Sequence, residues 1–70
     1  MADPSKLVWI DYTNYRGERR WRSIMPLGVH FQNSEYHPDT QWVIEAIDME
    51  RNQLREFAMK DIHEWRATAP

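Results

Sequence analysis

Arginines cluster near the start of the chain, at Arg16, Arg19, Arg20 and Arg22, and Trp21 stands between the last two. A guanidinium grips a phosphate through parallel N–H donors, and an aromatic ring offers a face for a nucleobase. Arg20 and Arg22 therefore suit an anionic ligand or single-stranded nucleic acid. The alternative is a solvated strand face with arginines paired to acidic residues across a hairpin. The net charge of −2 favours that alternative.

Arg55 is the second candidate cation. Period-two alternation places it on one strand face with Phe57 and Met59, at the rim of the core. A cation there must either be paired or be presented to a ligand. Glu45 is a plausible partner on the preceding strand, so both interpretations stay open.

His37 and Trp42 complete the candidate set. His37 lies beside Pro38 in a polar segment, where it either fixes a turn or contacts a ligand, because loops often carry function. Trp42 is most simply a core anchor, and it becomes a stacking or partner-binding site if it lies at the mouth of the barrel.

The sequence gives little support for catalysis. Ser23 and Ser34 lack the context of a nucleophile elbow, and Gly17 and Gly28 do not form a phosphate loop. The lone strand carboxylate Glu45 is better explained by solvent exposure or by pairing with an arginine. The chain has no cysteine and its three histidines are far apart. We therefore expect no enzyme activity, no cofactor and no metal site.

Strand signals cover most of the chain, with a central hairpin joining 41–46 to 55–58. Pro26 marks a strand end, a bulge or an edge, and Asp61 could cap a short terminal helix or 3-10 turn whose Ile62 and Trp65 face the core. The four tryptophans, three tyrosines and two phenylalanines predict a dense aromatic core. The expected strands are 6–12, 19–25, 27–31, 41–48 and 54–59, with a turn at 13–17, loops at 32–40 and 49–53, and the helical segment at 60–66.

These strands predict a mostly β fold, a small five-stranded barrel with a short C-terminal helical turn. Residues 1–70 form a single domain, of which 1–5 are expected to be disordered. The N-terminus lacks the apolar segment of a signal peptide, and no apolar run is long enough to span a bilayer. We therefore expect a cytoplasmic protein with no membrane partner.

Several short motifs follow one another in a fixed order over residues 7–62. They are Ile10-Asp11-Tyr12, Arg22-Ser23-Ile24-Met25-Pro26-Leu27, Trp42-Val43-Ile44-Glu45-Ala46-Ile47-Asp48 and Arg55-Glu56-Phe57, followed by Ile62. This series resembles the WYL domain family, whose pattern is an I-x-Y strand, an R-x-x-x-P-L strand, a W-Y-L-x-A-x-D strand and an R-x-F strand. Val43 replaces the family tyrosine and Ile44 the leucine.

The resemblance implies an SH3/Sm-like barrel that acts as a ligand-sensing module in bacterial transcription regulation, with a basic pocket for nucleotides or single-stranded nucleic acid. Tyr12, Arg22, Trp42 and Arg55 match the family motifs, and His37 is a looser match. No helix-turn-helix precedes the barrel, so a stand-alone module is expected. The predicted ligand-binding residues are Arg20, Arg22, His37, Trp42 and Arg55.

The alternative function is an SH3-like protein-interaction or self-association module. It would use exposed aromatics to engage a peptide or a second copy of the chain. Tyr15, Tyr36 and Trp21 are the candidates for that surface.

Overall fold

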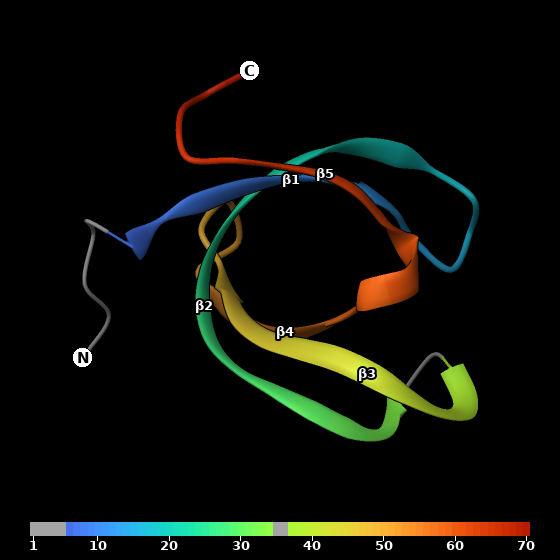
Figure 1. Cartoon of the computed structure of the whole chain (residues 1–70). Helices are drawn as coiled ribbons and strands as arrows, with labels where there is room; N and C mark the ends of the chain where they lie inside the picture. The colour runs from blue at the N-terminus through green and yellow to red at the C-terminus, as the bar shows by residue number, and fades with distance from the viewer. Residues whose placement is uncertain (1–5, 35–36) are drawn as a thin grey trace.

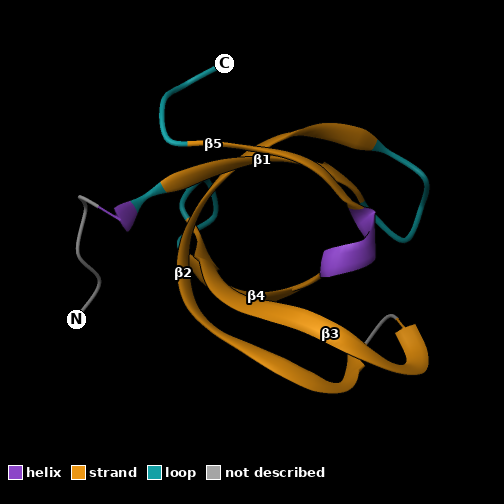
Figure 2. Cartoon of the chain, in the orientation of Figure 1, coloured by secondary structure: helices purple, strands orange, loops and turns teal. Residues whose placement is uncertain are grey.

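The computed structural model describes residues 6–34 and 37–70, which form one antiparallel sheet. The strand order across the sheet is β4-β3-β2-β1-β5 (Figures 1 and 2). A 3-10 turn, η2 (Met59–Asp61), joins the two strands at the sheet's edges. The strands are β1 (Val8–Thr13), β2 (Arg19–Ser34), β3 (His37–Asp48), β4 (Gln53–Ala58) and β5 (Ile62–Arg66).

The sheet curls around its apolar core, so that β1 and β5 lie opposite β3 and β4 (Figure 1). Tyr12 on β1 meets Phe57 on β4 edge to face, with ring centroids 5.1 Å apart. The Tyr12 hydroxyl also accepts a hydrogen bond of 3.2 Å from the Ala58 N–H. Strands that are not neighbours in the sheet are thus in contact across the core. The buried core cluster consists of Ile10, Tyr12, Ile24, Ile44, Ala46 and Phe57, with Val8 and Ile62 packed against it.

The predicted mostly β class is confirmed, and so is the number of five strands, but the two strands predicted at 19–25 and 27–31 are one strand and β5 was not predicted. The strand of residues 41–48 is also confirmed as an inner strand, because β3 pairs with both β2 and β4. The strand order leaves β4 and β5 as the two edges of the sheet. Closure of the sheet into a barrel therefore stays a prediction.

The predicted break between two strands at residue 26 is wrong, because β2 runs continuously from Arg19 to Ser34. The ladder with β3 shifts register between Pro26 and Gly28. Pro26 lacks an N–H to donate, and a bulge accommodates this without ending the strand. The sequence offered a strand end, a bulge or an edge at Pro26, and the bulge is what forms.

Of the short helix or 3-10 turn expected at 60–66, a 3-10 turn forms at the start of the segment, and the rest is a strand. The 3-10 turn ends at Asp61, and β5 follows with Ile62 opposite Tyr12 and Trp65 opposite Ile10 on β1. Pairing with the free edge of β1 satisfies the backbone groups of this segment in a ladder. Ile62 packs on the core as expected, whereas Trp65 remains 44% exposed.

The predicted loop at 32–40 is largely strand, because β2 extends to Ser34, which pairs with His37 at the start of β3. Residues 35–36, including Tyr36, lie outside the described residues, and so does the segment 1–5 that we expected to be disordered. Among the described residues no helix has the length and apolar character needed to cross a bilayer.

The expectation that Trp42 anchors the core is wrong, and Trp9, Trp21 and Trp65 are not fully buried either. Ile10 and Tyr12 face the core on β1, and alternation therefore turns Trp9 to the other side, where it is half-buried. Trp21 is half-buried on the same outer side, opposite Asp11. Trp42, the expected core anchor, is more than half exposed. Aliphatic side chains with Tyr12 and Phe57 fill the core instead.

Candidate functional site

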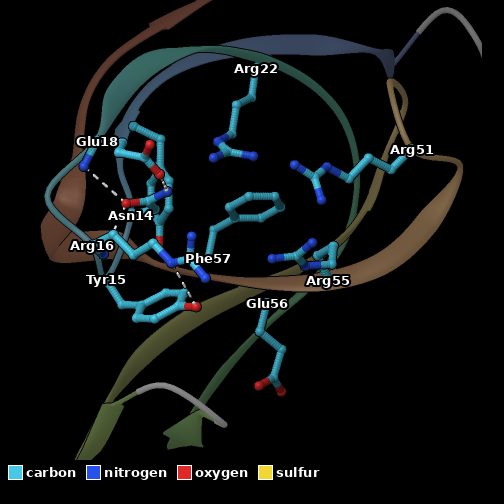
Figure 3. Close-up of a pocket in the computed structure, with 10 residues that line it drawn as sticks. Asn14, Tyr15, Arg16, Glu18, Arg22, Arg51, Arg55, Glu56 and Phe57 are labelled. Carbon is cyan, nitrogen blue, oxygen red and sulfur yellow. Dashed lines mark hydrogen bonds between the residues drawn. The ribbon is translucent and has the colours of Figure 1, made fainter.

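A hollow of about 220 Å³ opens between the turn that follows β1 and the turn that joins β3 to β4. Four of its lining residues are arginines, and we call it the arginine hollow (Figure 3). Arg22, Arg51 and Arg55 direct their guanidinium groups toward one space above the Phe57 ring. The full lining is Tyr12, Asn14, Tyr15, Arg16, Glu18, Arg22, Arg51, Arg55, Glu56 and Phe57.

Arg22 is a buried cation. It lies opposite Ile10 in the β1–β2 ladder, which places it on the core side, and its side chain is 7% exposed. Its Nη1 is 3.7 Å from Asp48 Oδ2, longer than a charge-assisted hydrogen bond. Arg22 Nε and Asp48 Oδ2 are buried without a hydrogen-bond partner among the described residues. Arg22 thus keeps donor capacity that the fold does not use.

Burial lowers the pKa of Arg22 below its usual value, and the nearby guanidinium of Arg20 lowers it further. Asp48 opposes this shift, while Arg55 and Arg51 add to it. The lowered pKa thus reflects burial first and neighbouring positive charge second, and perturbed pKa values of this kind are common at functional sites. An anion bound in the hollow would relieve the repulsion.

Tyr12 forms the aromatic wall beside Arg22. The Arg22 guanidinium carbon lies 5.8 Å from the centroid of the Tyr12 ring, within cation–π range. The hydrogen bond from Ala58 to its hydroxyl fixes the ring, and burial raises the pKa of Tyr12. Tyr12 therefore remains neutral and holds the guanidinium in place.

Arg55 does not pair with Glu45. It lies opposite Ala46 in the β3–β4 ladder, whereas Glu45 lies opposite Glu56 and projects from the other side of the sheet. Within 6–34 and 37–70, no ion pair forms at Arg55 or Arg51. The predicted pairing of Arg55 with Glu45 is therefore wrong, and presentation of Arg55 to a ligand stays a prediction.

The turn after β3 positions Arg51. Asp48 Oδ1 accepts hydrogen bonds from the backbone N–H groups of Glu50 at 3.0 Å and Arg51 at 3.4 Å. Asn52 then adopts a φ of 52°, a left-handed conformation that asparagine tolerates better than most residues. The same carboxylate thus orders the turn of Arg51 with one oxygen and faces Arg22 with the other.

The turn after β1 carries the opposite wall. Asn14 Oδ1 accepts hydrogen bonds of 2.9 Å from the N–H groups of both Arg16 and Glu18. Gly17 supplies a φ of +82°, which side chains with a Cβ rarely adopt. Arg16 Nε donates to the Tyr15 hydroxyl at 3.2 Å. This predicted turn is confirmed.

The two carboxylates in the lining are engaged elsewhere. Glu18 Oε1 accepts a hydrogen bond of 3.0 Å from Asn14 Nδ2. Glu56 Oε2 accepts one of 2.5 Å from Gln32 Nε2, and its side chain points away from the arginines in Figure 3. The space between Arg22, Arg51 and Arg55 therefore presents mainly donors and positive charge.

The structure brings Arg22 and Arg55 together in the arginine hollow, whereas neither Arg20 nor Trp42 lines it. Arg20 turns outward, with Nη1 3.0 Å from Glu50 Oε2, which matches the alternative of a paired, solvated arginine. Trp42 lies in a different hollow. His37 begins β3, but its side chain lies outside the described residues.

Sequence reasoning missed Arg51 and Arg16 as lining residues. Both lie in turns, where alternation gives no direction for a side chain. The available signals were Asn14 and Asp48, since these residue types hydrogen-bond the backbone two residues ahead and order a turn. The ordered backbone of such a turn fixes the position from which an arginine side chain extends.

The second hollow, of about 330 Å³, is apolar. Phe31 and Trp42 face each other across the β2–β3 ladder, with ring centroids 5.2 Å apart and planes tilted by 57°. They are 59% and 55% exposed. We call this the aromatic hollow, and its lining is Phe31, Thr40, Gln41, Trp42, Met59 and Lys60.

Comparison with known proteins gives one clear result. The family model of the WYL domain matches residues 4–67, which is nearly the whole chain. No curated protein matches the chain. The match spans all five strands and both walls of the arginine hollow. This chain therefore belongs to the WYL domain family, as the order of its motifs indicated.

Proposed function

We propose that this domain is a non-catalytic module that binds a phosphate-bearing ligand, a nucleotide or a short single strand of nucleic acid, in the arginine hollow. Arg22, Arg51 and Arg55 would hold phosphate oxygens, and Arg16 lines the opposite wall. Guanidinium groups suit this role because their donors match the geometry of phosphate oxygens.

The convergence of Arg22, Arg51 and Arg55 carries the proposal. Three cations share one space, and among the described residues the one ion pair that they form is the long contact between Arg22 and Asp48, at 3.7 Å. Concentrated positive charge costs stability and is retained where a ligand uses it. The volume of about 220 Å³ is below that of most drug-sized pockets, so it suits a phosphate and part of the group attached to it.

Family membership supports a ligand-sensing role in bacterial transcription regulation, in the cytoplasm. Ligand binding would serve as the signal, and a partner would convert it into an output. We place no reaction at the site, because anion binding accounts for the lining residues without one.

Titration of the isotopically labelled domain with a short thymidine oligonucleotide at low salt tests this proposal. We expect NMR shift changes concentrated at the side chains of Arg22, Arg51 and Arg55. Arg19 is the internal reference, because it is held by Asp11 at 2.7 Å outside the hollow. Shifts spread evenly over all arginines, or no shifts at all, would refute specific binding in the hollow.

A further inference from the structure

We propose that the aromatic hollow is a second subsite, which stacks a nucleobase of the same strand whose phosphate occupies the arginine hollow. This inference rests on the proposed function, and it specifies the ligand as a chain of nucleotides. Phe31 and Trp42 would supply the ring faces, and Lys60 a cation at the edge.

The exposed aromatic pair is the first support. Phe31 and Trp42 contact each other yet leave more than half of their surface open. Proteins that bind single strands combine a positive groove with aromatic side chains on which bases stack. The hollow offers ring faces together with Met59 and the aliphatic stem of Lys60, which is the apolar environment that a base requires.

The position of the hollow is the second support. On β3, Trp42 alternates with Ile44 and Ala46 on the core side of the sheet, and Ala46 lies opposite Arg55. On the adjoining segment, Arg55 precedes Met59 by four residues, about 13 Å of extended chain. Arg55 and Met59, which line the two hollows, are therefore four residues apart on one segment, on either side of the buried Phe57.

Charge favours a nucleic acid over a second copy of the domain. Lys60 at the aromatic hollow and the cations of the arginine hollow both complement a phosphate backbone. A second copy would complement the exposed rings but would bring its own arginines and lysine with it. One strand satisfies both hollows with a single ligand.

Length dependence follows from this geometry. A mononucleotide can fill the arginine hollow, but it engages the aromatic hollow poorly at a separation of about 13 Å. A hexanucleotide can reach both. We therefore expect affinity to rise by about ten-fold or more from the mononucleotide to the hexanucleotide, since stacking adds to phosphate binding.

The test compares Phe31→Ala with Val29→Ala, using thymidine mononucleotide, hexanucleotide and an abasic hexanucleotide. Val29 is a matched control, because it is about half exposed on β2, opposite Ile44, and does not line the aromatic hollow. We expect F31A to weaken hexanucleotide binding by about five-fold or more while mononucleotide binding stays unchanged. V29A should leave both unchanged, and the abasic strand should lose the same factor on the unsubstituted protein.

Equal effects of F31A and V29A, or equal affinity for the abasic and normal strands, would overturn the subsite. If Arg55→Gln still weakens binding in that case, the proposed function stands and only the subsite fails. Sedimentation velocity tests whether a second copy occupies this face. If the native domain is a dimer, and F31A dissociates it without changing hexanucleotide affinity, the face belongs to a second copy and the subsite is overturned. Should F31A not fold, the abasic comparison decides alone.

Discussion

Arg22 and Asp48 show, at the scale of single residues, how a site is built from an incompletely satisfied pair. Both side chains are buried, and their closest charged atoms are 3.7 Å apart. A buried pair of this kind contributes little net stability, but removal of one partner leaves an uncompensated charge. Asp48 therefore compensates the buried charge of Arg22 in part and leaves its Nε donor without a hydrogen bond among the described residues.

Replacement of Asp48 tests this arrangement. Asp48→Ala should lower the free energy of unfolding by about 3–5 kcal/mol, because it leaves Arg22 unpaired and frees the turn of Arg51. Asp48→Asn should cost less, since its amide oxygen can still accept from the Glu50 and Arg51 N–H groups. Urea denaturation measures both. Equal losses for the two variants would contradict the separate roles of the two carboxylate oxygens.

Arg55 should be dispensable for stability. It has no ion pair among the described residues, and its charge adds to those that lower the pKa of Arg22. We expect Arg55→Gln to raise the free energy of unfolding by about 0.5–1 kcal/mol, as expected when a functional charge is removed. A clear loss of stability on chemical denaturation would instead make Arg55 a structural residue.

Asp11 gives the fold a pH-dependent contact. Its hydrogen bond from Arg19, at 2.7 Å, lowers the pKa of the carboxyl below its ordinary 3.8, and partial burial opposes this. Because the folded pKa is the lower one, the contact stabilises above about pH 4 and is lost as the pH falls through the folded value. Between pH 6 and pH 2, the midpoint temperature of thermal unfolding should fall more steeply for the native sequence than for Asp11→Asn. Parallel curves would contradict this.

At the scale of elements, two turns determine the site. Asn14 and Asp48 each hydrogen-bond two backbone N–H groups ahead of them, and these bonds hold the segments that carry Arg16 and Arg51. The strands supply Arg22 and Arg55 through simple alternation. The arginine hollow is thus half strand and half turn.

The turn after β1 can be tested with a pair of asparagines. Asn14→Ala removes three side-chain hydrogen bonds, and we expect it to lower the free energy of unfolding by about 1–3 kcal/mol. Asn33→Ala removes the bond that Asn33 accepts from Thr40 and should cost about 1 kcal/mol or less. Denaturant midpoints compare them. Equal losses in the free energy of unfolding for N33A and N14A would contradict a larger stabilising contribution from the three Asn14 hydrogen bonds.

The alternation of side chains in the sequence predicted which face of a strand each residue occupies. It placed Val8, Ile10 and Tyr12 together on one strand face and put Arg22 and Trp21 on different faces; both assignments are confirmed, and the first face is the core side. It could not predict that Arg20 would reach Glu50, because a turn brings Glu50 near. Likewise the bulge at Pro26 and the pairing of β5 depend on partner strands that are distant in sequence. Local patterns carry no information on such partners.

At the scale of the whole molecule, charge is divided between a positive hollow and an otherwise acidic surface. The chain has nine lysines and arginines, eleven acidic residues and a net charge of −2. Four of its arginines line one hollow. Long-range attraction therefore does not draw a polyanion to the domain as a whole, and any affinity must come from the hollow.

The salt dependence of binding should report this local character. Three phosphate contacts in a single strand give a slope of log K against log salt of about −2. Loss of one contact in Arg55→Gln should reduce the slope by about 0.7. Fluorescence anisotropy of a labelled thymidine oligonucleotide over a range of salt concentrations measures both slopes. An unchanged slope in R55Q would exclude Arg55 from the phosphate contacts.

The most direct test of anion binding in the arginine hollow compares Arg55→Gln with Arg66→Gln in oligonucleotide affinity at low salt. Both remove one positive charge, but Arg66 lies on β5, bonded to Glu64 at 2.8 Å and outside the hollow. We expect R55Q to weaken binding by about ten-fold or more, the contribution of a hydrogen bond to a charged group. R66Q should stay within about two-fold of the native sequence, since exposed, remote charges are screened. Equal weakening by both variants would contradict a site in the hollow and leave only a diffuse charge effect.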